Sequence, residues 1–182
     1  MGHLAACADL PTVTKSMARD ALAWEGVVRS AATGDEAAFA RLVEANHASM
    51  ARVAYVVAGD PDTASDAVQA AWSIAWRKLG SLRDPGSIRA WLVAIAANEA
   101  RKARASRRRE LVLDISAEPP GAVMGDPIEA IGVIDLQRAM RGLSGEQRSL
   151  LAMRYVADLD ATEIGRQLGI SGSGVRSRLA RT

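Results

Sequence analysis

Apolar residues recur at intervals of three and four along most of the chain, the spacing that places them on one face of an α-helix. No stretch alternates apolar and polar residues for long enough to form a sheet. In the first part of the chain the stripes predict four helices, over residues 19–32, 36–58 and 62–79 and from Asp84–Pro85 through Trp91 into a basic segment. The pattern therefore favours an all-α fold.

The predicted helix over residues 62–79 has two distinct faces. The apolar face is expected to lie in the core and holds Val68, Trp72, Ala75, Trp76 and Leu79. The opposite face carries polar side chains separated by alanines, namely Asp62, Asp66, Gln69, Ser73 and Arg77. Such a face is either ordinary solvated surface or, because its side chains are short, a docking surface for a partner helix.

The next predicted helix changes character along its length. Asp84 is its expected N-cap, with Pro85 in the first turn. Its apolar residues end at Ala100, and six of the nine residues from Arg101 to Arg109 are Lys or Arg. The far end is thus predicted to leave the core and to carry a positive field suited to phosphate, although a charge run alone more often marks a solvated helix end.

The C-terminal part has the spacing of a helix-turn-helix. Two capping boxes predict helix starts, Ser144 with Gln147 and Asp160 with Glu163. Gly165 is expected where two helices cross, Gly169 at the turn, and Val175 as the buried anchor of a last helix. That helix then exposes the small polar and Arg side chains that read base edges, namely Ser173, Arg176, Ser177, Ala180 and Arg181, with Arg178 placed for phosphate.

Composition excludes several classes of site. Cys7 is the only cysteine and the chain has two histidines, so neither an intrachain disulfide nor a tetrahedral Cys/His zinc site is expected, and no metal or cofactor is predicted. His47 is expected to be an exposed or hydrogen-bonded helix residue. The longest apolar run, Ala90 to Ala97, has eight residues, so we expect no membrane insertion and a cytoplasmic location.

Charge and turn residues divide the chain. Residues 110–135 hold six acidic and no basic side chains, and residues 110–126 contain Pro and Gly without a helical period, which predicts a flexible linker. The expected order is a mobile tail over 1–18, a helical domain over 19–109, the linker over 110–126, and a helix-turn-helix domain over 127–182 that begins with a helix around 127–141. The acidic linker either shields the basic block or simply aids solubility.

The two domains together resemble a known family. ATEIGRQLGISGSGVRSRL, preceded by LSGEQRSLLAMRYVADL, is similar to the fourth conserved region of bacterial sigma factors. DTASDAVQAAWSIAWRKL, followed by RAWLVAIAANEARKARASRRR, resembles the second conserved region of the small extracytoplasmic-function class. The resemblance covers roughly residues 22–109 and 135–182. It implies a two-domain helical transcription initiation factor without catalysis of its own.

The resemblance also implies roles for individual residues. The residues that the resemblance assigns to binding of the polymerase β′ clamp helices are Asp62, Asp66, Gln69, Ser73 and Arg77. Capture of the minus-10 strand falls on Leu82, Arg83, Asp84, Ser87, Trp91, Asn98, Arg101, Lys102 and Arg104. Reading of the minus-35 element falls on Ser171, Ser173, Arg176, Ser177, Arg178 and Arg181. The implied partners are core RNA polymerase, including its β flap, promoter DNA and an anti-sigma factor.

The sequence departs from the family pattern at a few positions. Gly174 stands where Thr is usual and Gly165 where Ala is common, and either glycine is expected to loosen its helix by about 0.5 to 1 kcal/mol. Leu82 replaces a usual aromatic, and the chain ends at Thr182, one or two turns early, so a short last helix is expected. Competing interpretations are a stand-alone helix-turn-helix regulator and a protein-only adaptor.

Overall fold

The computed structural model of the chain describes residues 24–113, 140 and 142–182. Every regular element in these ranges is helical, which agrees with the all-α prediction. The predicted tail over 1–18, the predicted linker beyond residue 113 and nearly all of the predicted helix over 127–141 lie outside the described residues. None of the helices in the described ranges combines the length and apolar character that a membrane span requires.

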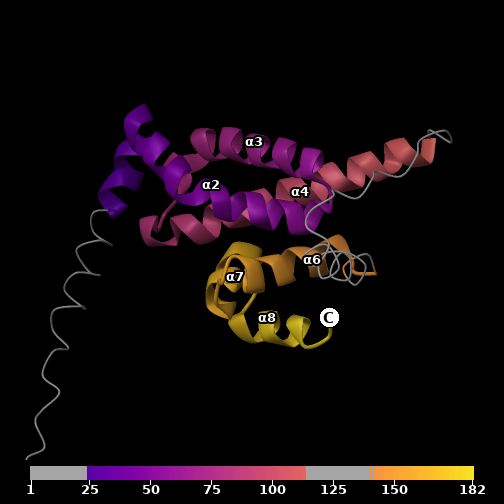
Figure 1. Ribbon diagram of the computed structural model, residues 1–182. Helices are drawn as coiled ribbons and strands as arrows, with labels where there is room; N and C mark the ends of the chain where they lie inside the picture. Colours follow the sequence, from indigo (N-terminus) through magenta and orange to yellow (C-terminus); the bar gives the residue numbers. More distant parts are fainter. Residues whose placement is uncertain (1–23, 114–139, 141) are drawn as a thin grey trace, which may run out of the picture.

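Four helices make up the N-terminal half. They are the helical residues 24–32, α2 (Glu36–Ala58), α3 (Pro61–Lys78) and α4 (Ile88–Leu113). Helices α2, α3 and α4 contact one another as one bundle (Figure 1). Two short 3-10 turns, Leu79–Ser81 and Pro85–Ser87, connect α3 to α4. The second and third predicted helices are confirmed to within one residue at each end.

Aspartates fix the starts of these elements. The carboxylates of Asp35, Asp60 and Asp84 each accept a hydrogen bond from a backbone N–H of the turn that follows. Burial tends to raise the pKa of Asp60, but hydrogen bonds from Thr63 and the positive charge of Arg107 bring the pKa of that carboxyl below its ordinary value. A carboxylate that stays ionised accepts hydrogen bonds from the free backbone N–H groups at the start of the helix and interacts favourably with the positive end of the helix dipole.

The core of the bundle combines large aliphatic residues with alanines. Leu42 and Met50 of α2, Leu79 beside α3 and Leu92 of α4 are at most 1% exposed and belong to one cluster. Residues 24–32 cover this cluster with the buried side chains of Val27, Val28 and Ala31.

The tryptophans of α3 correct one prediction, because they are not wholly in the core. Trp76 is 41% exposed and Trp72 is half-buried. The Phe39 ring of α2 meets both indoles edge to face, with centroid separations of 5.7 Å to Trp72 and 4.8 Å to Trp76. The physical reason is the size of the side chains. The fully buried residues on this side of α3 are Ala71 and Ala75, whose small side chains let the helices pack closely and leave no room for an indole between them.

Helix α4 is longer than predicted. It runs to Leu113, past residue 110 where the linker was expected to begin, because no Pro or Gly interrupts residues 110–113. Its basic end extends away from the rest of the bundle (Figure 1), in agreement with the loss of apolar residues after Ala100.

The C-terminal half is a short helical unit. It contains α6 (Gly145–Leu151), a π-helical turn (Ala152–Val156), α7 (Ala161–Leu168) and α8 (Gly172–Leu179). Both predicted capping boxes are present. Gly169 adopts the left-handed conformation at φ 68°, which a glycine tolerates at the end of α7, and its N–H donates to the Gly165 carbonyl. Val175 is fully buried, as predicted for the anchor of α8.

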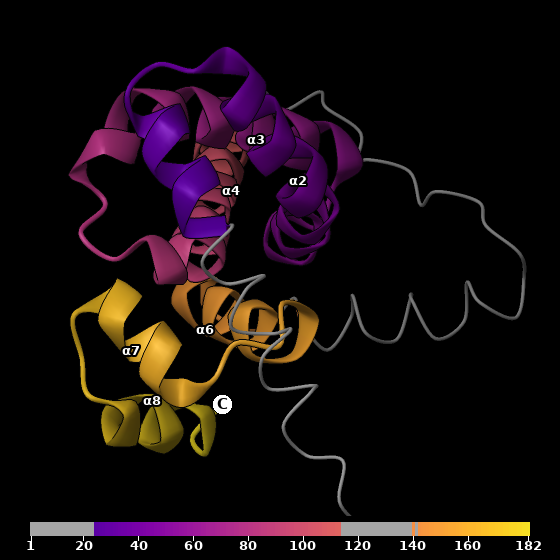
Figure 2. The same ribbon diagram turned by 90° about the vertical axis from the view of Figure 1, so that its left-hand side faces the viewer.

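The two halves pack against each other. Helix α6, the π-helical turn and α7 contact α2 and α4, whereas α8 packs on α6 and α7, on the side away from the bundle (Figure 2). One continuous apolar cluster takes buried residues from both halves, including Val53, Val93, Leu150 and Met153. The arrangement therefore rests on a shared core.

Candidate protein and nucleic-acid interfaces

The polar face of α3 is fully open. All five of its predicted binding residues are exposed, namely Asp62, Asp66, Gln69, Ser73 and Arg77. Ser73 donates a hydrogen bond to the backbone carbonyl of Gln69. The other four side chains form no hydrogen bond or ion pair with any residue in the described ranges. The face is thus free for a partner, and its role stays a prediction.

A groove of about 730 Å³ lies next to that face, between α2 and α3. Its lining is mostly apolar and includes Val43, Tyr55, Val68 and Trp72, with His47 and Gln69 among the polar residues. The Trp72 indole N–H donates to Nδ1 of His47 at 3.3 Å, which confirms His47 as a hydrogen-bonded helix residue. Gln69 belongs to both the groove and the polar face, so the two surfaces are continuous.

The loop between α3 and α4 is held by its own hydrogen bonds. The Asp84 carboxylate accepts from the Gly86 N–H at 3.1 Å, and the Ser87 hydroxyl donates to the Asp84 carbonyl at 2.7 Å. Leu82 and Trp91 pack against the core of the bundle, while Arg83 is exposed. The predicted minus-10 loop therefore exposes Arg83 and Asp84, while Leu82 and Trp91 support it from the core side.

The predicted minus-10 residues of α4 fall into different environments. Arg101 is exposed and donates to Oδ1 of Asn98 at 2.8 Å. Lys102 instead pairs with Glu99 at 2.7 Å, and both line a shallow groove that Asp66 of α3 also borders. Lys102 thus shares a groove with Asp66 of the predicted polymerase face, whereas Arg101 does not line that groove.

Two other arginines of the basic segment brace the bundle. The Arg104 guanidinium donates to the backbone carbonyl of Ala58, at the end of α2. Arg107 lies 3.2 Å from the Asp60 carboxylate and donates to the Thr63 hydroxyl at 3.3 Å. The positive charge of Arg104 and Arg107 is therefore committed in part to the junction of α2 and α3, which the sequence pattern did not indicate.

Helix α8 presents the predicted minus-35 residues to solvent. Ser171 caps the helix and its hydroxyl lies 2.9 Å from that of Ser173. Arg181 donates to the Ser177 hydroxyl at 2.7 Å. Arg176 is exposed and has no hydrogen bond or ion pair with any residue that the structure describes. Among the arginines of α8 and its end, Arg176 is thus the one with an uncommitted guanidinium.

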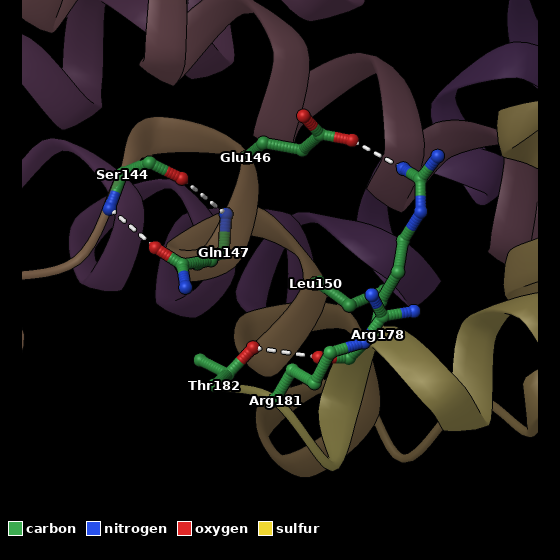
Figure 3. A pocket seen from close by; sticks show the side chains of 7 residues that line it. All are labelled: Ser144, Glu146, Gln147, Leu150, Arg178, Arg181 and Thr182. Atoms are coloured by element: carbon green, nitrogen blue, oxygen red, sulfur yellow. Dashed lines mark hydrogen bonds and ion pairs between the residues drawn. The ribbon is translucent and has the colours of Figure 1, made fainter.

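The guanidinium of Arg178, unlike that of Arg176, has a partner. Its guanidinium forms an ion pair with Glu146 of α6, at the mouth of a pocket of about 270 Å³ that Leu150 and Thr182 also line (Figure 3). Both partners are about half exposed, so the pair contributes at most about 1 kcal/mol to stability. Contact between Arg178 and a phosphate would compete with Glu146.

Three residues with structural importance were missed by the sequence reasoning. Arg89 donates to the Ala157 backbone carbonyl at 2.5 Å, and Glu146 pairs with Arg178. Arg148 is 5% exposed and donates to the Leu143 carbonyl at 2.6 Å. Only Arg148 has its partner nearby in the sequence, five residues away, whereas the partners of Arg89 and Glu146 lie 68 and 32 residues away, where no local pattern marks them.

Comparison with known proteins identifies both halves. Residues 42–110 match the family described as Sigma-70 region 2, and residues 134–182 match the family described as Sigma-70, region 4. The ECF RNA polymerase sigma factor SigL of Mycobacterium tuberculosis is 31% identical over 157 residues, which is 82% of this chain and 88% of SigL. The chain belongs to the extracytoplasmic-function (ECF) class of RNA polymerase sigma factors.

Further relatives of this sigma factor agree. The sigma factor NccH of Alcaligenes xylosoxydans xylosoxydans is 28% identical over 165 residues, 86% of this chain and 89% of NccH. The probable sigma factor RfaY of Xanthomonas campestris is 29% identical over 159 residues, or 83% of this chain, but this chain spans only 40% of the length of RfaY. We use "region 2" below for residues 24–113 and "region 4" for residues 140 and 142–182.

Solved structures share the fold of this sigma factor. CnrH, in complex with the cytosolic domain of CnrY, superposes with a TM-score of 0.66 at 21% identity over 87% of this chain and 91% of CnrH. RpoE of Bartonella quintana, in complex with the anti-sigma factor NepR, gives a TM-score of 0.64 at 22% identity over 79% of this chain and 90% of RpoE.

Gly165 of this sigma factor is required by its surroundings. A Cβ at this position would lie 2.5 Å from the backbone carbonyl oxygen of Ile170 and 3.3 Å from the Gly172 nitrogen. Neither backbone atom can rotate away, so α7 and the start of α8 can approach this closely only because residue 165 lacks a side chain. The prediction of a small residue where two helices cross is confirmed by this contact, and the effect of Gly165 on the stability of its own helix stays a prediction.

We therefore expect Gly165→Ala to destabilise the sigma factor by about 1 to 3 kcal/mol through overpacking. Thermal unfolding followed by circular dichroism measures the change. Gly174→Ala is the matched control, because a Cβ there would lie 3.3 Å from the Ser171 hydroxyl and at ordinary contact distances of 3.9 and 4.0 Å from two Ile170 carbons. It should shift stability by less than about 1 kcal/mol. Equal effects of the two substitutions would contradict the role assigned to Gly165.

Proposed function

We propose that this sigma factor binds core RNA polymerase through the polar face of α3, captures the minus-10 strand with the α3–α4 loop and the outer side of α4, reads the minus-35 element with α8 and promotes promoter opening. It acts in the cytoplasm and catalyses no reaction itself. The observation that carries the proposal is that both sigma regions occur in one chain, and that the predicted polymerase-binding residues of α3 and the predicted minus-35 residues of α8 are exposed.

In this arrangement, one set of contacts supplies the affinity for DNA and another supplies the preference for particular bases. A base that leaves the duplex loses stacking and pairing of a few kcal/mol, so the loop must hold it. Arginines of α4 and α8 supply phosphate attraction, which makes binding fall steeply with salt. An Arg bidentate to a guanine edge discriminates between bases by about 1 to 3 kcal/mol, and Arg176 is the candidate on α8.

An anti-sigma factor is proposed as a further partner. CnrH and RpoE, two solved proteins that share this fold, are each in a complex with another protein, the cytosolic domain of CnrY and the anti-sigma factor NepR. The apolar groove between α2 and α3 offers this chain a surface of suitable character for a protein helix. The β flap of polymerase is proposed to meet region 4.

Run-off transcription tests the function. Core polymerase supplied with this chain should initiate at specific promoters of its own genome, whereas core polymerase alone should not. A stand-alone helix-turn-helix regulator would bind DNA without polymerase, and a protein-only adaptor would bind no promoter DNA. Failure to initiate at every tested promoter, also with a longer version of the chain, would show that the proposed function is wrong.

A further inference from the structure

One of the three arginines on the exposed side of α8 and its end is tied to another helix. Arg178 forms an ion pair with Glu146 of α6, and the two residues lie 32 positions apart in the chain. Arg181 donates to Ser177 of α8, and Arg176 has no hydrogen bond or ion pair with any described residue. Arg178 therefore differs from both in having a carboxylate partner outside α8.

The position of Glu146 is set by the start of α6. The Ser144 hydroxyl accepts from the Gln147 N–H at 3.2 Å, and the Gln147 side chain accepts from the Ser144 N–H at 2.8 Å (Figure 3). This capping box encloses Glu146, and a carboxylate in the first turn also interacts favourably with the positive end of the helix dipole. Glu146 is therefore presented to Arg178 from a fixed turn.

The ion pair is open to exchange with ions from solution. The Glu146 side chain is 61% exposed and that of Arg178 is 46% exposed, and neither has a second hydrogen-bond partner among the described residues. Water and salt weaken an ion pair with this exposure. Arg178 can therefore leave Glu146 for another anion without any charge becoming buried and unpaired.

A DNA phosphate is the anion that competes for Arg178 when region 4 binds a promoter. Arg178 precedes Arg181 by three residues, which makes the two side chains neighbours on the helix surface, and both line the pocket between α6 and the end of α8 (Figure 3). Arg178 thus borders the face that we propose for the minus-35 element. A guanidinium binds a phosphate in the same two-donor geometry that it uses for a carboxylate.

We infer that Glu146 is a positioning residue that acts through Arg178: it holds the Arg178 guanidinium on the α6 side of α8 and so weakens the attachment of region 4 to DNA phosphate. The inference rests on the proposed reading of the minus-35 element by α8. Phosphate contacts add affinity for DNA of any sequence, whereas base contacts select the sequence. Glu146 therefore lowers the affinity for DNA in general and leaves the preference for the promoter element to residues such as Arg176.

Glu146→Gln tests the inference, because the amide keeps the size of the side chain and removes its charge. Holoenzyme with this variant should bind a short duplex with a scrambled minus-35 element about three- to eightfold more tightly near 0.1 M salt. The slope of log affinity against log salt should become more negative by about 0.9, the value for one additional phosphate. The intact element should gain by the same factor. Fluorescence anisotropy over a series of salt concentrations measures both quantities.

Arg178→Ala provides the matched background. If Glu146 acts through Arg178, Glu146→Gln should lose most of its effect on affinity and on slope when it is combined with Arg178→Ala. The double variant still lacks the negative charge of Glu146, so it separates the action through Arg178 from the general field of the protein. Equal gains with and without Arg178 would assign the effect to that field and overturn the inference.

Two other outcomes would also overturn it. An unchanged slope in Glu146→Gln would mean that Arg178 gains no phosphate contact when the carboxylate is removed. Weaker DNA binding together with a lower temperature of thermal unfolding would mean that the ion pair serves to hold α8 in place. If the unaltered holoenzyme showed no preference for the intact element, that result would count against the proposed function, and the slopes would still decide the role of Glu146.

Discussion

A sigma factor that carries Asp66→Arg together with Gln69→Arg is expected to bind core polymerase at least about 100-fold more weakly. The substitutions reverse one charge and add another on the docking face, a loss of electrostatic complementarity that costs several kcal/mol, and 1.4 kcal/mol is tenfold. Both side chains are exposed and neither forms an ion pair with a described residue, so the fold should be unaffected. Fluorescence anisotropy with labelled core polymerase measures the affinity.

The matched control is Glu44→Arg with Ala45→Arg. These two residues are exposed on α2, and their substitution produces the same change in net charge. The control should bind core polymerase within about threefold of the unaltered protein if the effect is local rather than a long-range field, which salt screens beyond about 10 Å. Equal losses in the two double variants would show that α3 is not the docking face.

Arg176→Ala is expected to lower the preference of the holoenzyme for an intact over a scrambled minus-35 element by about 10- to 100-fold, as the loss of a bidentate guanine contact requires. The guanidinium is exposed and uncommitted within the described residues, so its removal leaves no buried group unsatisfied. Promoter fragments with the two upstream sequences, titrated at one salt concentration, give the ratio.

Arg41→Ala serves as the charge-matched control, because Arg41 is exposed on α2 and its replacement by Ala also removes one positive charge. It should leave the ratio unchanged. If Arg176→Ala weakened binding to both fragments equally, Arg176 would be a phosphate contact rather than a reader of bases.

Local features of the fold were predictable because local chemistry sets them. Helix periodicity and the caps at Ser144 and Asp160 placed the helices, since each cap acts within three residues of itself. Gly169 and Val175 followed from the spacing of the helix-turn-helix, and the structure confirms both.

Features that depend on distant parts of the chain were not predictable in this way. The exposure of Trp76 depends on how closely α2 and α3 approach, and the bracing role of Arg104 depends on the position of the end of α2. The contact between Arg89 and Ala157 joins residues 68 positions apart, and no local pattern marks either partner. The sequence indicated which side chains would be exposed on α3 and α8, but not that region 4 rests on region 2.

The apolar cluster that region 2 and region 4 share also bears on how the protein unfolds. If each region had a separate core, each would melt at its own temperature. Because Val53, Val93, Leu150 and Met153 are buried together, loss of order in one region exposes residues that the other needs. The free chain is therefore expected to unfold as one cooperative unit, and a destabilising substitution in α6 should also destabilise α2 and α4.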